Sequence, residues 1–209
     1  MTRNIEKIYN DLRADFEITP DYVIDFYSKN NLLLNNIKSF IDKEELRLFI
    51  EIVWQYLNAV YQKDRFNETV DFADKNLKLI DSELIKLNAD ELKDDWYNGI
   101  LHFKGMASYR LRNYKTSTPI YKYLTKSDPK NDSFKNWLNY STYGQRLWLV
   151  NTINIICGVM VLVYFFSKEF IEVFEIRISI LGVAMFGLFA NWGYEYYIKR
   201  SFRKTTKTN

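Results

Sequence analysis

Side chains that could carry out covalent or acid–base chemistry are few in this sequence. It contains one histidine, His102, and one cysteine, Cys157, which lies inside an apolar run. Neighbouring carboxylates such as Glu44-Glu45 point apart on a helix and are typical of caps or solvated surfaces. A lone histidine is more often packed than catalytic. We therefore predict that the protein is not an enzyme and expect no metal site and no cofactor.

Polar side chains inside two long apolar runs are the more informative feature. Asparagines and small residues are spaced along one face of each predicted helix. Between transmembrane helices, such hydrogen bonds contribute about 0.6–2 kcal/mol, and small residues allow close approach. We predict that these residues pack the two helices together; the alternative is that the asparagines line a pore or join subunits. The predicted packing residues are Asn151, Asn154, Gly158, Ala184, Gly187 and Asn191.

The two apolar runs have the length of membrane spans. The run 147–166 contains no Asp, Glu, Lys or Arg, and a helix of about 20 residues rises about 30 Å, the thickness of a bilayer core. The second run begins at 178 and extends to 198 through Trp192 and a group of tyrosines, which are typical of the interface. We predict a transmembrane hairpin over 147–198; two buried helices of a soluble bundle are the alternative.

The positive charge lies in a tail over 199–209. The net charge is +3, and the five tail cations exceed it. Nucleic-acid binding is not expected, because a nucleic-acid site would place clustered cations on the folded domain. The cations also favour a cytosolic position for both ends of the chain, in the plasma or inner membrane if the protein is bacterial. The predicted membrane-surface cations are Lys199, Arg200, Arg203, Lys204 and Lys207.

Residues 1–146 read as an antiparallel helical domain. Apolar residues recur at helical spacing from Leu46 to Tyr61, and Asp42 with Glu45 resembles a capping pair. Only 7 Gly and 3 Pro occur, which disfavours a β fold built from many tight turns. The expected fold class is all-α. The last helix of this domain, from Ser133, is expected to continue into the first span.

The segment 98–131 carries a more specific pattern. Gly105 and Ala107 occupy small positions, Tyr114 opens a second helix, and Asp128-Pro129 forms a closing turn. This pattern resembles a tetratricopeptide repeat, a helix-turn-helix unit of about 34 residues. Three residues depart from it: Lys104 replaces an apolar residue, Ser117 replaces Ala, and Pro119 should bend or shorten the second helix. A weaker copy precedes it, with Phe66 and Tyr114 48 residues apart.

The resemblance implies a partner-binding groove lined by the first helix of each repeat. The matching positions are Glu51, Trp54, Asn58, Tyr61, Gln62, His102, Met106, Tyr109 and Arg110. The alternative is that the aromatic residues only pack against neighbouring helices. We expect a membrane-anchored adaptor or accessory subunit that binds a protein partner and the lipid bilayer, alone or as a homo-oligomer. The alternative function is an oligomeric channel or membrane-disrupting effector whose helical domain senses a signal.

Overall fold

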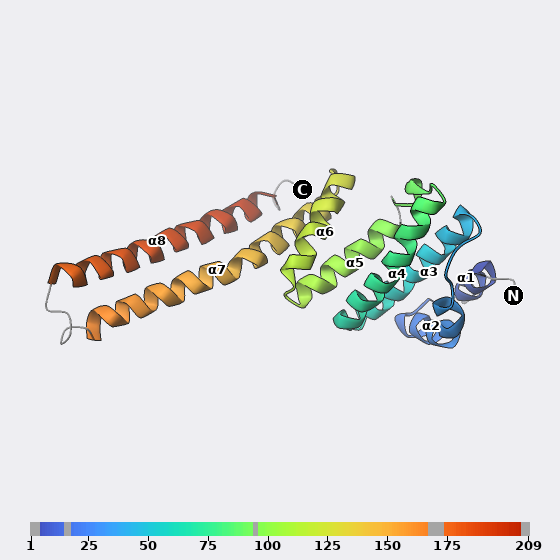
Figure 1. Cartoon of the computed structure of the whole chain (residues 1–209), viewed down its shortest axis with the longest axis horizontal. Coiled ribbons are helices and arrows are strands. Elements are labelled where there is room, and N and C mark those ends of the chain that lie inside the picture. Colours follow the sequence, from blue (N-terminus) through green and yellow to red (C-terminus); the bar gives the residue numbers. More distant parts are fainter. Residues whose placement is uncertain (1–4, 15–17, 94–95, 167–173, 206–209) are drawn as a thin grey trace. The chain divides into compact units, whose positions relative to one another are not determined.

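The computed structural model describes residues 5–14, 18–93, 96–166 and 174–205, which form helices joined by short connections, with no strand among them (Figure 1). The all-α prediction is therefore confirmed for this part of the chain. The chain divides into two compact units, Met1–Leu138 and Asn139–Asn209. The elements are α1 (Ile5–Arg13), α2 (Pro20–Asn35), α3 (Lys43–Gln62), α4 (Phe66–Lys86), the 3-10 helix η1 (Asp90–Lys93), α5 (Trp96–Arg110), α6 (Tyr114–Ser127), α7 (Asp132–Phe166) and α8 (Phe174–Thr205).

Side-chain caps set the starts of α2 and α3. The Thr19 hydroxyl accepts a hydrogen bond from the Tyr22 backbone N–H at 3.2 Å. The Asp42 carboxylate accepts from the Glu45 N–H at 2.8 Å, and the Glu45 carboxylate accepts from the Ile41 N–H at 2.7 Å. Each bond satisfies a backbone donor at or just before the first turn of a helix. The predicted capping pair is therefore present, with the return bond at Ile41.

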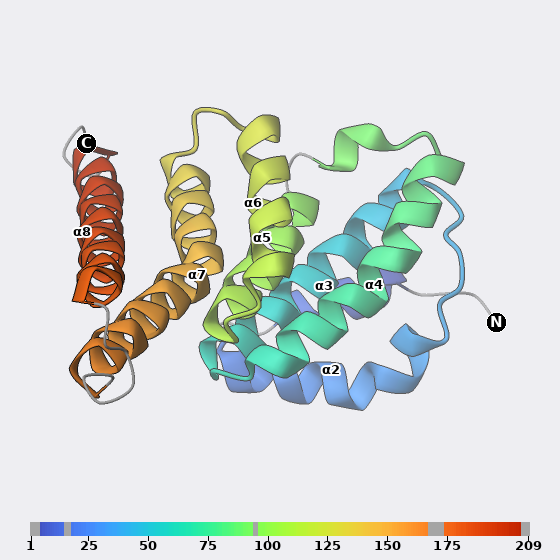
Figure 2. The same cartoon turned by 60° about the vertical axis from the view of Figure 1, so that its left-hand side comes forward.

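Helix α3 is the centre of the first unit. It contacts α1, α2, α4 and α5, while α5 contacts α3, α4 and α6 (Figure 2). Its apolar face, from Leu46 to Val60, packs on Ala73, Ile80 and neighbouring residues of α4 in one continuous core. Helix α3 contacts α5 directly, although α4 lies between them in the sequence. This arrangement is typical of stacked helix pairs, in which each pair covers the apolar face of the next.

Two glycines let the helices of this unit approach closely. A Cβ at Gly99 would lie 2.3 Å from Nε1 of Trp54 on α3, and a Cβ at Gly105 would lie 2.9 Å from the Tyr121 ring on α6. Helix α5 is continuous through Gly99. A larger residue at this position would displace the Trp54 indole. Lys104 is mostly covered and its ammonium pairs with Asp74 of α4 at 2.5 Å. This ion pair explains why a charged residue occupies the usually apolar position.

The turn before α4 recurs before α6. Asp64 and Arg112 each lie two residues before the helix and adopt positive φ angles of 56° and 59°. Arg65 N–H donates to Val60 C=O at 3.2 Å, and Asn113 N–H donates to Ser108 C=O at 2.8 Å. The positions in each pair are 48 residues apart in the sequence. The same backbone turn therefore joins α3 to α4 and α5 to α6, as expected for two copies of one unit.

The predicted shortening of α6 by Pro119 is not observed, while the alternative, a bend at Pro119, stays a prediction. The helix runs from Tyr114 to Ser127 with Pro119 inside it. Pro119 is the sixth helical residue, so its missing N–H deprives only the carbonyl of Lys115, at the exposed start of the helix. Water can satisfy that carbonyl.

Helix α7 is continuous from Asp132 to Phe166, as predicted, and passes through Gly144 without interruption. Among the residues described, α7 is the one helix that is long enough and apolar enough to cross a membrane. The second predicted span, 178–198, lies within the 32-residue helix α8 and stays a prediction. In the second unit, α8 runs antiparallel to α7 (Figure 1).

Candidate functional site

Glu51 lies between α1 and α3 and is not part of an open groove. It is 2% exposed, and its carboxylate accepts hydrogen bonds from the Tyr9 hydroxyl at 3.1 Å and from Arg13 at 2.7 Å. Arg47, one turn earlier on α3, adds a contact at 3.4 Å. The expectation that Glu51 contacts a partner is therefore corrected: α1, for which the repeat pattern makes no prediction, covers this position and neutralises its charge.

The aromatic residues of the predicted groove pack between α3 and α5. Trp54 contacts Trp96 and Phe103 at centroid distances of 4.6 and 6.0 Å, and Tyr61 contacts Phe103 at 5.6 Å. Tyr109, which follows Tyr61 by 48 residues, makes a similar ring contact with Trp137 of α7, at a centroid distance of 5.3 Å. These rings are half-buried, so each one stabilises the helix stack and leaves part of its surface exposed.

His102 is packed among aromatic rings. Its Nδ1 lies 3.2 Å from the Tyr121 hydroxyl, and the rings of Phe134 and Trp137 are 5.3 and 6.4 Å away. Burial lowers the pKa of His102 to about 4, so the side chain is neutral at pH 7. Met106 is half-buried and packs against the cluster around Tyr121. The positions of His102 and Met106 fit a packing role.

Polar and charged groups form the accessible part of the α3–α5 face. Gln62 and Arg110 are exposed, and the Gln62 amide donates to Asn58 at 2.9 Å. A side-chain hydrogen bond to Tyr61 raises the pKa of Arg110 above its ordinary value. Tyr61, Gln62 and Arg110 therefore bring a phenol, an amide and a guanidinium to one surface, which suits a polar segment of a protein partner.

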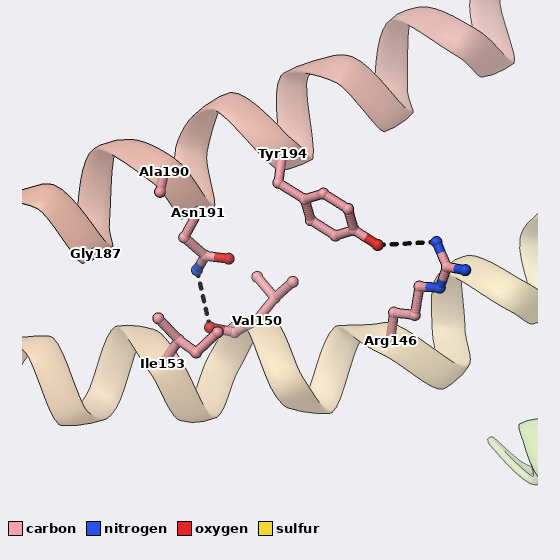
Figure 3. Close-up of a pocket in the computed structure, with 7 residues that line it drawn as sticks. All are labelled: Arg146, Val150, Ile153, Gly187, Ala190, Asn191 and Tyr194. Carbon is pink, nitrogen blue, oxygen red and sulfur yellow. Dashed lines mark hydrogen bonds between the residues drawn. The ribbon is translucent and has the colours of Figure 1, made fainter.

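Asn191 is the central polar contact between α7 and α8. It is 6% exposed, and its amide donates to the side-chain Oδ1 of Asn154 at 2.7 Å and to the Val150 backbone C=O at 3.0 Å (Figure 3 shows the bond to Val150). Both amide hydrogens of Asn191 therefore have a partner within the hairpin. Asn151, by contrast, is exposed on another side of α7.

Small residues bring α7 and α8 together. A Cβ at Gly187 would lie 2.7 Å from Sγ of Cys157, and Ala184 is completely buried. Gly158 is exposed, and nothing lies within 4 Å of the Cβ position there. The structure thus brings Asn154, Ala184, Gly187 and Asn191 together at the hairpin contact but leaves Asn151 and Gly158 outside it.

Sequence reasoning missed four residues of this contact: Arg146, Val150, Cys157 and Tyr194. Val150 and Cys157 are buried in the hairpin, and Arg146 donates to the Tyr194 hydroxyl at 3.0 Å. Their spacing carries a signal, because positions 146, 150, 153 and 157 on α7 and 184, 187, 191 and 194 on α8 alternate steps of three and four. That pattern is typical of two helices that pack along a shared seam.

The tail cations follow the second predicted span. Helix α8 reaches Thr205, so Lys199, Arg200, Arg203 and Lys204 occupy its last turns, and Lys207 lies outside the described residues.

Comparison of the chain with protein-family models, curated proteins and solved structures finds no match in any of the three.

Proposed function

We propose that this protein is a membrane-anchored adaptor or accessory subunit of a membrane complex. In this proposal a cytosolic, tetratricopeptide-like domain over 1–146 binds a protein partner, and a hairpin over 147–198 crosses the bilayer twice. The basic tail then lies against the cytosolic membrane surface.

The observation that carries this proposal is the distribution of side chains in the hairpin. Its interior holds the aliphatic Val150, the small residues Cys157 and Ala184, and the polar Asn191. Its exterior carries the large apolar side chains: Ile155, Ile156, Val159, Leu162, Phe165, Phe166, Val183, Phe186, Phe189 and Trp192 are each more than half exposed. A water-soluble helical pair has the opposite distribution.

Lipid is the solvent that makes this distribution favourable. Leaving a Leu, Ile or Phe side chain in water rather than burying it costs about 1.5–3 kcal/mol. Contiguous apolar surface of this extent on a monomer marks a membrane or protein interface. In lipid the apolar side chains face the acyl chains, and van der Waals packing and the Asn154–Asn191 hydrogen bond hold the helices together.

Thiol labelling tests the two spans and their orientation. In a Cys157→Ala background, single cysteines replace Gln145, Glu175 or Lys207, and intact cells receive a membrane-impermeant maleimide. We expect labelling at 175 from outside, and labelling at 145 and 207 only after permeabilisation. Labelling of 175 and 207 from the same side would refute the second span, and the inverse pattern would refute the orientation.

Partner binding is proposed for the exposed polar part of the α3–α5 face. Gln62→Ala with Arg110→Ala should abolish recovery of a protein partner that co-purifies in mild detergent, while helicity by circular dichroism is unchanged. Lys122→Ala, an exposed cation on α6, is the matched control and should retain the partner. Equal recovery of the partner with the double variant and with the control variant would place the binding surface elsewhere.

A channel-forming oligomer is the second candidate, and Asn151 is the observation that favours it. Its amide is exposed on an apolar segment, where a bilayer offers no hydrogen-bond partner. Ion flux in vesicles that contain the full chain, lost in Asn151→Leu, would support a channel. Absence of flux above that of empty vesicles would exclude it.

A further inference from the structure

A groove of about 460 Å³ lies between α7 and α8, close to the start of the first predicted span (Figure 3). Its volume is within the range of small-molecule sites, about 300–1,000 Å³. The groove has two distinct parts. One end carries the Arg146 guanidinium and the Tyr194 hydroxyl, and the wall beyond is formed by Val150, Ile153, Gly187 and Ala190.

The polar end of the groove has an unbalanced positive charge. The exposed Arg146 guanidinium donates to the neutral Tyr194 hydroxyl at 3.0 Å. Within the part of the chain that the structure describes, Arg146 forms no ion pair, and none of the residues lining the groove is acidic. A guanidinium of this kind binds phosphate oxygens through two parallel N–H donors, and the phenol can add a third.

The remainder of the groove suits an acyl chain. Val150, Ile153 and Ala190 present aliphatic carbon, and Gly187 adds no side chain. The one polar residue in this part, Asn191, uses both amide hydrogens within the hairpin, on Asn154 and on the Val150 carbonyl. The wall therefore favours hydrocarbon over a polar ligand.

We propose that this groove binds one anionic phospholipid, with its phosphate on Arg146 and Tyr194 and part of an acyl chain along Val150, Ile153 and Ala190. This inference rests on the membrane insertion proposed above, which places Arg146 at the head-group level, just before the charge-free run. An anionic head group fits better than a zwitterionic one because the groove supplies a cation without a compensating acid, and each juxtamembrane cation favours anionic lipid.

The test uses the full chain, purified in mild detergent and analysed by native mass spectrometry. The probes are dioleoyl phosphatidylglycerol, dioleoyl phosphatidylcholine and inorganic phosphate. We expect one bound phosphatidylglycerol, at least about fivefold tighter than phosphatidylcholine, which corresponds to one favourable cation. Arg146→Gln should weaken phosphatidylglycerol binding about fivefold, and Ala190→Phe should block it by filling the groove.

Two matched controls complete the experiment. Lys122→Gln removes a cation outside the hairpin, and Gly193→Phe adds the same ring on α8 where nothing lies within 4 Å of the Cβ position. Both should bind phosphatidylglycerol like the wild type. Equal affinity for the two lipids, unchanged binding in Arg146→Gln and Ala190→Phe, displacement by an equal concentration of inorganic phosphate, or a dimer that excludes lipid would overturn the proposal.

Failure of this site and failure of the membrane anchor are separable. Extraction of the wild-type chain from membranes by alkaline carbonate would refute the anchor. A chain that resists carbonate but shows no head-group preference would refute the lipid site alone.

Discussion

The contact between Gly187 and Cys157 allows a stringent test of the hairpin. A Cβ at position 187 lies 2.7 Å from the Cys157 sulfur, while a disulfide places its two sulfurs about 2.05 Å apart and its two Cβ atoms about 3.5–4.5 Å apart. Gly187→Cys therefore brings two thiols within bonding reach after small shifts. The bond would close a loop of about 30 residues, for which chain entropy gives about 3.7 kcal/mol of stabilisation.

The assay treats membranes that contain Gly187→Cys with an apolar oxidant and then counts free thiols by intact-protein mass under denaturing conditions. We expect an intramolecular bond and the loss of both thiols. Gly182→Cys is the matched control, because it lies on the same helix with nothing within 4 Å of the Cβ position. Bonding at 182 as fast as at 187, or only intermolecular dimers at 187, would refute the described packing of α7 on α8.

Three further predictions concern polar contacts. In SDS titrations of the full chain in mixed micelles, Asn154→Ala and Asn191→Ala should show a coupling energy of about 0.6–1.7 kcal/mol, whereas Asn151→Ala should show none with Asn191→Ala. Between pH 7 and pH 4.5, wild type should lose about 2 kcal/mol more unfolding free energy than His102→Gln. The reason is that the folded pKa of about 4 lies below the unfolded value of about 6.5, so the unfolded state binds the proton first. Glu51→Gln should lower the free energy of unfolding by about 1–3 kcal/mol and release α1, measured by urea denaturation and hydrogen exchange.

Each of these predictions has an outcome that contradicts it. Equal coupling of Asn151 and Asn154 to Asn191 would place both on the hairpin contact. Parallel stability profiles for wild type and His102→Gln would mean that the imidazole is solvated. Unchanged exchange of α1 amides in Glu51→Gln would show that apolar packing alone holds that helix.

Local signals in the sequence were sufficient to predict where several of the helices begin. Thr19 and Asp42 mark helix starts because their side chains accept backbone N–H groups a few residues on, and this requires no distant contact. The start of α6 at Tyr114 and the small residue at Gly105 were likewise predicted from the repeat pattern. The continuation of α7 into the first predicted span followed from the absence of any breaker between Ser133 and Leu147 other than Gly144.

Facing residues on different elements could not be read in the same way. Asn151 and Asn154 differ by three positions, so both fall near one helix face, and the position of Asn191 selects Asn154. Glu51 matched a groove position in the repeat, but α1 lies outside the repeat pattern and covers it. Burial in these two cases depends on a second helix, whose rotation and register are not encoded locally.

The recurrence of one turn at Asp64 and Arg112 has a consequence for how the chain tolerates changes in length. The two turns have the same geometry although they are 48 residues apart, rather than the about 34 of a regular unit. The added length lies in α4 and in the connection that contains η1, outside the contact between α3 and α5. Ala89 in this connection is completely buried, so an insertion that leaves it in place and follows the exposed Asp90 should keep the stacking of successive helix pairs intact. The start of η1 is therefore the natural place to add a reporter or a binding module.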